Sequence, residues 1–285
     1  MRFRTRFAPS PTGPLHLGHA YSAILAHDMA RAAGGDFLLR IDDIDQSRAR
    51  PIWEAQIITD LQWLGLTWDG PPRRQSDHLP AYRAAIDQLG QMGLTFPCHC
   101  TRRDIRDAAN APQEGGPPPT GPDGLIYPGT CRHRPMAAMG PGDAIRLDMT
   151  KAMDMARQTA ARGFDEIGPA HQGHHPITAH NMIATIGDVV LARPAMGAAY
   201  HLSVVIDDAE QAVTHVIRGQ DLFAATAIHV LLQALLDLPT PQYHHHHLIR
   251  DDTGKRLAKR DDARAIHSYR AEGATPQDIR RMIGL

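Results

Sequence analysis

Two histidines with two residues between them, His16 and His19, directly follow a turn rich in proline and glycine at residues 9–14. Residues 3–7 alternate apolar and polar side chains, which is typical of a β-strand. Residues 21–33 are rich in Ala, Leu, Ile and Met and end at a pair of glycines, which predicts a helix. Strand, turn and helix together predict the opening of a mononucleotide-binding unit.

Such a turn directs backbone N–H groups and the positive end of the helix toward phosphate. Both histidines would reach one triphosphate, and Gly18 between them would let a nucleotide lie against the backbone. The H-x-G-H pattern alone is short and recurs by chance, so a stiff surface loop with two histidines is the alternative.

The second group of residues that could bind a ligand or react consists of three cysteines, Cys98, Cys100 and Cys131. An odd number argues against a disulfide framework and favours a metal site or free thiols. Cys98 and Cys100 would share one tight turn, and Cys131 would close the site across a long Pro/Gly-rich loop that needs an anchor. A structural zinc would supply that anchor. Three free thiols are the alternative, and the ordinary candidates for a fourth ligand are His99 and His133.

Composition limits the class of protein. The chain has 285 residues, 42% hydrophobic and 21% charged, as in ordinary globular proteins. It shows no apolar run of membrane-spanning length and no signal peptide, so we expect a soluble, cytoplasmic protein, and we expect a monomer. The net charge of −1 means that any nucleic-acid contact must come from local basic patches.

Further along the chain, hydrophobic patterns predict the remaining elements. We expect helices at residues 51–64, after Leu79, and around 228–235. We expect strands at 36–42, 144–147, 200–208 and 214–221, several of them followed by acidic residues or Arg-Gly. The run His244–His247 is interpreted as a natural linker, and the histidines at 171, 174, 175 and 180 as parts of a solvated loop.

The whole run Arg6–His19, R-F-A-P-S-P-T-G-P-L-H-L-G-H, closely resembles the first signature of class I aminoacyl-tRNA synthetases, in the form of the glutamate-activating branch. Three more segments match that branch: R-I-D-D-I-D at 40–45, A-Y-H-L-S-V-V-I-D-D at 199–208 and V-I-R-G-Q-D-L at 216–222. Residues 256–260, R-L-A-K-R, resemble the second signature, K-M-S-K-S. A charged surface loop is the alternative there, but Lys151 is the only lysine besides Lys255 and Lys259.

The resemblance implies roles for individual residues. Glutamate would be bound by Arg6, Phe7, Ala8, Pro9, Ser10, Asp42, Tyr200 and Arg218; Asp42 replaces a Glu that helps hold the ammonium group. ATP would be bound by His16, Gly18, His19, Arg256, Leu257 and Lys259, with His16, His19 and Lys259 catalytic; Ala258 replaces a serine of the signature. The family pattern C-x-C…Y-x-x-x-C implies that Tyr127 completes the zinc site.

The resemblance also implies an architecture. The fold would be α/β, with a Rossmann-type parallel-sheet catalytic domain formed by residues 1–94 and 187–247. A zinc-bearing, acceptor-binding α+β subdomain would be inserted at 95–186. Residues 248–285 would hold the second signature loop and a short helical segment.

The implied activity is adenylation of L-glutamate with ATP and Mg²⁺, before any tRNA binds. Because the chain ends at Leu285, soon after Lys259, it resembles shortened paralogues without the anticodon-binding region of glutamyl-tRNA synthetases. These attach glutamate to queuosine at the wobble position of tRNA(Asp). Phosphates of the RNA would be contacted by arginines of the insertion (Arg102, Arg103, Arg132 and Arg134) and by arginines near the second signature (Arg256, Arg260 and Arg264). The alternatives are a minimal glutamyl-tRNA synthetase, a non-catalytic tRNA-binding paralogue, and an H-x-G-H nucleotidyltransferase, which would lack R-G-x-D-L and the Lys259 loop.

Overall fold

The protein is seen in a computed structural model that describes residues 2–109, 119–156, 163–250 and 264–285. Its N-terminal half begins with a parallel sheet, in the order β1-β2-β3. The predicted strands and helices of this region are confirmed. The elements are β1 (Arg4–Phe7), α1 (Leu17–Ala32), β2 (Asp36–Ile41), α2 (Pro51–Trp63), β3 (Arg73–Arg74), η1 (Gln75–His78) and α3 (Leu79–Gln91).

The sharp return from α1 to β2 depends on glycine. Gly34 has a positive φ of 61°, which ends the helix, and a Cβ on Gly35 would lie 2.2 Å from the carbonyl oxygen of Phe3. The backbone of this turn therefore packs directly on the start of β1.

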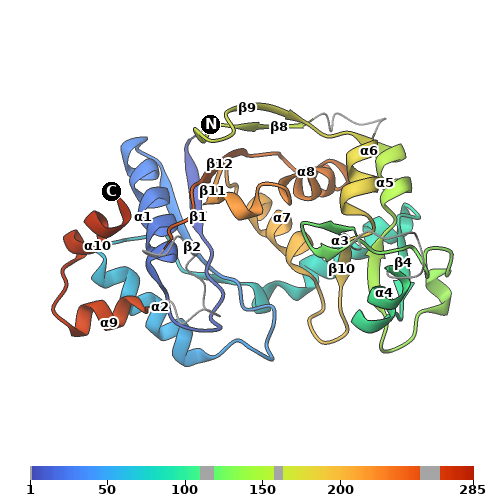
Figure 1. The fold of residues 1–285 in the computed structure, drawn as a ribbon, viewed down its shortest axis with the longest axis horizontal. Helices are drawn as coiled ribbons and strands as arrows, with labels where there is room; N and C mark the ends of the chain where they lie inside the picture. Colours follow the sequence, from blue (N-terminus) through green and yellow to red (C-terminus); the bar gives the residue numbers. More distant parts are fainter. Residues whose placement is uncertain (1, 110–118, 157–162, 251–263) are drawn as a thin grey trace.

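A second sheet lies next to β1 of the first sheet (Figure 1). Its parallel strands β11, β12 and β8 are followed by an antiparallel edge strand, β9. Arg4 of β1 and Thr214, just before β11, join the two sheets: the backbone N–H of Arg4 donates to Oγ1 of Thr214 at 2.8 Å, and the backbone N–H of Thr214 donates to the carbonyl oxygen of Arg4 at 2.9 Å. The elements are β8 (Gly163–Glu166), β9 (Gly173–Pro176), α7 (Tyr200–Glu210), β11 (His215–Gly219), η4 (Gln220–Leu222), α8 (Thr226–Leu235) and β12 (Gln242–His246).

The middle of the chain builds an antiparallel sheet, β10-β7-β4, on the other side of the molecule (Figure 1). Since β10 follows residue 187, this sheet uses residues from both sides of the proposed domain boundary, and that division stays a prediction. The elements are β4 (Thr95–Cys98), α4 (Arg102–Ala109), β5 (Thr120–Gly121), β6 (Gly124–Leu125), η2 (Met136–Ala138), β7 (Ala144–Leu147), α5 (Met149–Ala156), α6 (Ala179–Asn181), η3 (Met182–Ile186) and β10 (Val190–Ala192).

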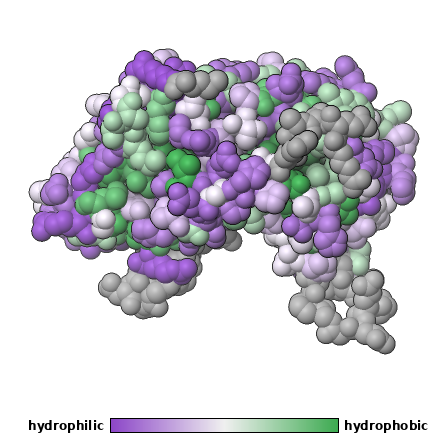
Figure 2. Space-filling view, turned by 90° about the horizontal axis from the view of Figure 1, so that it is seen from above, coloured by the Kyte–Doolittle hydropathy of each residue, from purple (hydrophilic) through white to green (hydrophobic). Residues whose placement is uncertain are grey.

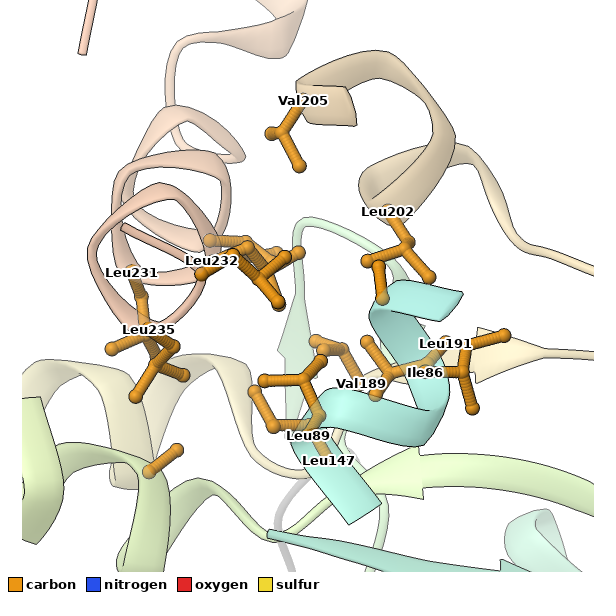
Figure 3. Close-up of a cluster of buried hydrophobic side chains, with 14 of the residues drawn as sticks. Ile86, Leu89, Leu147, Val189, Leu191, Leu202, Val205, Leu231, Leu232 and Leu235 are labelled. Atoms are coloured by element: carbon orange, nitrogen blue, oxygen red, sulfur yellow. The ribbon is translucent and has the colours of Figure 1, made fainter. Parts of the chain in front are cut away.

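Two large apolar clusters hold these parts. One joins α3, β7, α5, β10, α7 and α8, and Figure 3 shows leucines of α7 and α8 pointing toward Leu89, Leu147 and Leu191. The other lies between α1, α2 and the first sheet. The C-terminal helices complete it: α9 (Ile266–Ala271) contributes Ile266, and α10 (Pro276–Ile283) contributes Ile279 and Ile283. The expected helical segment therefore packs against the opening strand-turn-helix unit.

Three sequence predictions about local structure are wrong. Residues 200–208 form helix α7, not a strand. His244–His246 belong to strand β12, not to a linker, and His174 and His175 lie in strand β9, not in a loop. For α7 and β12, partners distant in sequence decide the conformation, because residues 201–208 of α7 are all buried and β12 lies between two other strands. Strand β9 instead pairs with the preceding strand β8 as an antiparallel hairpin.

Polar and apolar residues are interspersed over the face seen in Figure 2. Within the described part of the chain, no helix combines the length and apolar character needed to cross a bilayer.

Candidate active site

A cavity of about 600 Å³ opens where β1, the start of α1, the end of β2 and the start of α7 meet. The wall of this cavity contains every predicted glutamate-binding residue and the predicted ATP-binding residues of the first signature. These are Arg6, Phe7, Ala8, Pro9, Ser10, Asp42, Tyr200 and Arg218, together with His16, Gly18 and His19. Segments far apart in the sequence therefore converge on one site.

The two histidines are fixed by the end of helix α1 itself. Nδ1 of His16 accepts from the backbone N–H of Gly18 at 3.1 Å, and Nδ1 of His19 accepts from that of His16 at 3.2 Å. This reciprocal cap brings the two rings together, with their centroids 3.8 Å apart and their planes tilted by 36°. Because Nδ1 accepts in both rings, the neutral tautomers carry their proton on Nε2, the form that donates to a phosphate oxygen.

Gly18 is required by this cap. A Cβ at Gly18 would lie 3.1 Å from Cε1 and 3.2 Å from Nδ1 of His16. Any side chain would press on the imidazole that accepts the backbone bond. The glycine thus serves the histidine arrangement in addition to the close approach of a nucleotide that the sequence suggested.

A buried ion-pair network lies beside the predicted glutamate-binding residues. Asp208 of α7 accepts from Nε of Arg6 at 2.9 Å and from Nη1 of Arg40 at 2.6 Å. Burial alone would raise the pKa of Asp208, but the two guanidinium groups reverse this and lower it. The carboxylate is therefore ionised and holds Arg6 in the cavity wall.

Asp42, which replaces the family's Glu, is also engaged by this network. Its Oδ1 accepts from Nε of Arg40 at 2.7 Å. Burial raises the pKa of Asp42, while the charge of Arg40 opposes that shift. Asp42 lines the cavity, which is the position that a contact with the ammonium group of glutamate requires. That contact itself stays a prediction.

Arg218 is surrounded differently. Its guanidinium donates to Nε2 of His245 and to Nδ1 of His229, both at 3.0 Å, and to Oγ1 of Thr226 at 2.8 Å. All of these groups are buried. Arg218 itself lines the cavity next to Tyr200.

The three cysteines converge as predicted. The sulfur atoms of Cys98, Cys100 and Cys131 all lie within 4.8 Å of one another. Oη of Tyr127 is 3.4 Å from Sγ of Cys98 and 3.6 Å from Sγ of Cys100. Ligands on a tetrahedral zinc, with Zn–S of about 2.3 Å, are about 3.8 Å apart, so these spacings suit a zinc ion. His99 contacts only Cys131 among the three, at 3.8 Å from its Nδ1, which favours Tyr127 as the fourth ligand.

A second cavity of about 960 Å³ adjoins the first and shares Tyr200 with it. Its wall includes Cys98, Cys100 and Tyr127, and five arginines, Arg48, Arg102, Arg106, Arg146 and Arg193. Of these arginines, only Arg48 forms an ion pair with another described residue, Asp45. Asp45, Asp123 and Asp188 also line the wall, so arginines outnumber carboxylates by five to three and the cavity is a basic hollow beside the candidate active site.

Other arginines expected to contact phosphate are used within the fold. Arg132 pairs with Asp188 at 2.8 Å and Arg134 with Asp143 at 3.0 Å. Arg103 makes a surface contact with Asp107 at 3.6 Å. The residues Arg256, Leu257, Ala258 and Lys259 of the second signature lie outside the described residues.

Sequence reasoning missed four residues of the site, Arg40, Thr226, His229 and His245. Each is buried and bonded to a predicted site residue, as the contacts above show. One signal was available: a buried arginine needs partners, so polar residues within apolar segments near Arg6 and Arg218 are candidates.

Comparison with known proteins agrees with this geometry. The family model described as tRNA synthetases class I (E and Q), catalytic domain, matches residues 2–285. The chain is 66% identical to the glutamyl-Q tRNA(Asp) synthetase of Rhodobacter capsulatus, over 99% of each chain. It is 39% identical to that of Rhodopirellula baltica, over 97% of this chain and 82% of the relative.

Solved structures of glutamate–tRNA ligases share the fold. One from Elizabethkingia meningosepticum, in complex with its amino acid, matches with a TM-score of 0.77 and 27% identity. One from Elizabethkingia anophelis matches with a TM-score of 0.78 and 26% identity. All of this chain is covered, but it spans only 61% of each of those chains.

The fold, the cavity and the family model define a class I aminoacyl-tRNA synthetase of the glutamate and glutamine branch. Within that class, the chain belongs to the glutamyl-Q tRNA(Asp) synthetase family. The predicted fold class and enzyme class are thus confirmed.

Proposed function

We propose that this protein activates L-glutamate with ATP and transfers it to queuosine at the wobble position of tRNA(Asp). The observation that carries the first step is the single cavity in which the capped histidines of α1 meet Arg6, Tyr200 and Arg218. One part suits a triphosphate, and the other suits an anionic amino acid. The transfer step rests on the relatives, which are glutamyl-Q tRNA(Asp) synthetases.

In the activation step, a carboxylate oxygen of glutamate attacks the α-phosphorus of ATP. The bond to the β-phosphate oxygen breaks, and pyrophosphate leaves. Because the nucleophile is already ionised, no strong base is needed, and catalysis consists of positioning and charge stabilisation. His16 and His19 would donate through Nε2, the N-terminus of α1 would add its partial positive charge, and Lys259 would meet the phosphates of the Mg²⁺–ATP substrate.

In the transfer step, a ring hydroxyl of queuosine attacks the carbonyl carbon of the adenylate, AMP leaves with the electron pair of the broken C–O bond, and the hydroxyl proton is released to solvent or to the departing phosphate. The acceptor base must therefore enter the same cavity. The adjoining basic hollow suits the phosphates of an RNA loop, because Arg102, Arg106 and Arg193 lie along its wall. Tyr200 stands between the two spaces.

Zinc would be a structural cofactor of this protein. Cys98, Cys100, Cys131 and Tyr127 have the donor types and spacings of a closed tetrahedral site. Burial raises the pKa of Cys100 to about 11, so a nearby cation is needed to keep this thiol ionised at neutral pH. The ion would tie β4 to the loop after β6 and so shape the basic hollow.

Two assays test the function. Glutamate-dependent exchange of pyrophosphate into ATP should proceed without tRNA, and none of the other nineteen amino acids should replace glutamate efficiently. Labelled glutamate should then attach to tRNA(Asp) that contains queuosine and be absent from unmodified tRNA(Asp). Efficient charging of the 3′ end of tRNA(Glu) would instead identify a minimal glutamyl-tRNA synthetase, and binding of tRNA without exchange would identify a non-catalytic paralogue.

The assigned roles of individual residues, the monomeric state and the cytoplasmic location stay predictions. Measurement of the molecular mass in solution tests the monomeric state directly.

A further inference from the structure

Arg218 carries its charge without a carboxylate partner. The other two arginines of the cavity, Arg6 and Arg40, both contact Asp208. None of the ion pairs between described residues includes Arg218, although it is only 7% exposed. A buried cation without a counter-charge is costly, so this difference requires a reason.

The neighbours of Arg218 are neutral hydrogen-bond acceptors. Nε donates to His245, Nη1 to His229, and Nη2 to Thr226 and to the carbonyl oxygen of Leu222 at 3.4 Å. The ring of Tyr243 covers the guanidinium at 5.3 Å. A guanidinium has five N–H groups, and these four bonds leave one, on Nη1. The group is thus held in one orientation by atoms that do not cancel its charge.

Each of the two histidines also hydrogen-bonds away from Arg218, and each of these chains of hydrogen bonds ends at a carboxylate. Since Arg218 can only donate, Nε2 of His245 must accept, and Nδ1–H of His245 then donates to Glu166. By the same reasoning, Nε2–H of His229 donates to Nδ1 of His201 at 3.0 Å. Nε2–H of His201 donates to Asp123 at 2.8 Å.

Glu166 and Asp123 therefore balance the charge of Arg218 across one and two imidazole rings. Burial lowers the pKa of His245 to about 2, and burial together with the charge of Arg218 lowers that of His229 well below its usual value. Both rings stay neutral at physiological pH. The carboxylates of Glu166 and Asp123 stabilise the buried cation from a distance. They do not contact the guanidinium of Arg218, so a ligand carboxylate can bind next to it.

We propose that His229, His245 and Thr226 are positioning residues that aim Arg218 at a carboxylate of the amino-acid substrate while leaving the cation unpaired by protein carboxylates. This inference rests on the proposed activation of glutamate. It adds that the neutrality of these three side chains, and not only their hydrogen bonding, determines the affinity for glutamate.

Two matched pairs of variants separate charge from shape. His229→Glu and His229→Gln differ from each other only in charge, and so do Thr226→Asp and Thr226→Asn. The glutamine and asparagine variants should keep the KM for glutamate within about threefold of the unaltered protein. The carboxylate variants should raise that KM at least about tenfold and change kcat by less than about threefold, because a protein carboxylate would occupy Arg218 before the substrate binds.

Glutamate-dependent pyrophosphate exchange gives KM and kcat, and the rise in Tm on adding glutamate gives binding without turnover. The rise should be retained in the neutral variants and lost in the charged ones. A structural role alone would make the two members of each pair alike in KM, and that result in an active protein overturns the inference. An unaltered protein without glutamate-dependent exchange would overturn the proposed function instead. If substitution at His229 prevents folding, as Tm would reveal, the Thr226 pair decides.

Discussion

Replacing Asp208 by asparagine should separate the charge of the network from its shape. Asparagine keeps the size of the side chain and one acceptor oxygen, but removes the negative charge that Arg6 and Arg40 share. Arg40 retains Asp42 as a partner at 2.7 Å. Arg6 forms no second ion pair with a carboxylate in the described part of the chain, and its side chain is only 7% exposed.

Removing one partner of a buried ion pair costs about 3 to 5 kcal/mol, because the remaining charge is left uncompensated. Asp208→Asn should therefore lower the free energy of unfolding by about 3 to 5 kcal/mol, which corresponds to a fall in Tm of roughly 5 to 8 °C for a chain of this length. Urea unfolding with an unchanged m-value measures the first quantity, and thermal unfolding the second. The KM for glutamate should also rise, because Arg6 loses the contact that fixes it.

The matched control is Asp87→Asn, which breaks an exposed pair with Arg83. That pair should contribute less than about 0.5 kcal/mol. The pKa of Asp208 is lowered in the folded protein, so its stabilising effect is present above the unfolded value of about 3.9 and is lost as the pH falls below it. The difference between Asp208→Asn and the unaltered protein should thus be constant from pH 5 to about 8. A loss below about 1 kcal/mol at pH 7, similar to that of the control, would refute the reasoning.

Three further predictions concern the metal, the buried histidines and the second signature. Cys100→Ser should reduce zinc from about one ion per chain to almost none and lower Tm, and metal analysis that finds zinc retained would contradict the assigned ligands. His245 has a folded pKa of about 2, below its unfolded value, so stability is full above about pH 6.5 and falls by about 1.4 kcal/mol per pH unit below it. His245→Gln should reduce that slope in urea unfolding between pH 7 and 5, and equal slopes would count against the buried neutral ring. Lys259→Ala should lower kcat for pyrophosphate exchange by roughly 100-fold or more, and an unchanged rate would remove Lys259 from the mechanism.

The opening unit and the Cys98–Cys100 pair were predictable because their information is local. A strand, a Pro/Gly turn and a helix within residues 3–33 fix where His16 and His19 lie, and the structure adds only that each caps the other. The C-x-C spacing likewise places two thiols on one turn. The resemblance to known signatures then connected these local units to Tyr200 and Arg218 before any contact was seen.

Helix α7 shows where local information ends. Residues 201–208 are all buried, so the segment has no polar face and its apolar run carries no helical period. As a helix it directs Asp207 toward Arg73, Gln75 and Tyr82, and Asp208 toward the neighbouring arginines. A strand would have sent the two adjacent side chains to opposite faces.

The residue types that could bind phosphate, zinc and an anionic amino acid can be read from the sequence, because they follow from side-chain chemistry at short spacing. Which charges remain unpaired depends on the folded structure. Arg132 and Arg134 are neutralised by Asp188 and Asp143, which lie 56 and 9 positions away, whereas Arg218 meets neutral imidazoles. The charge available to a ligand depends on which ion-pair partners folding brings together. These partners lie apart in the sequence, so a local sequence pattern does not predict them.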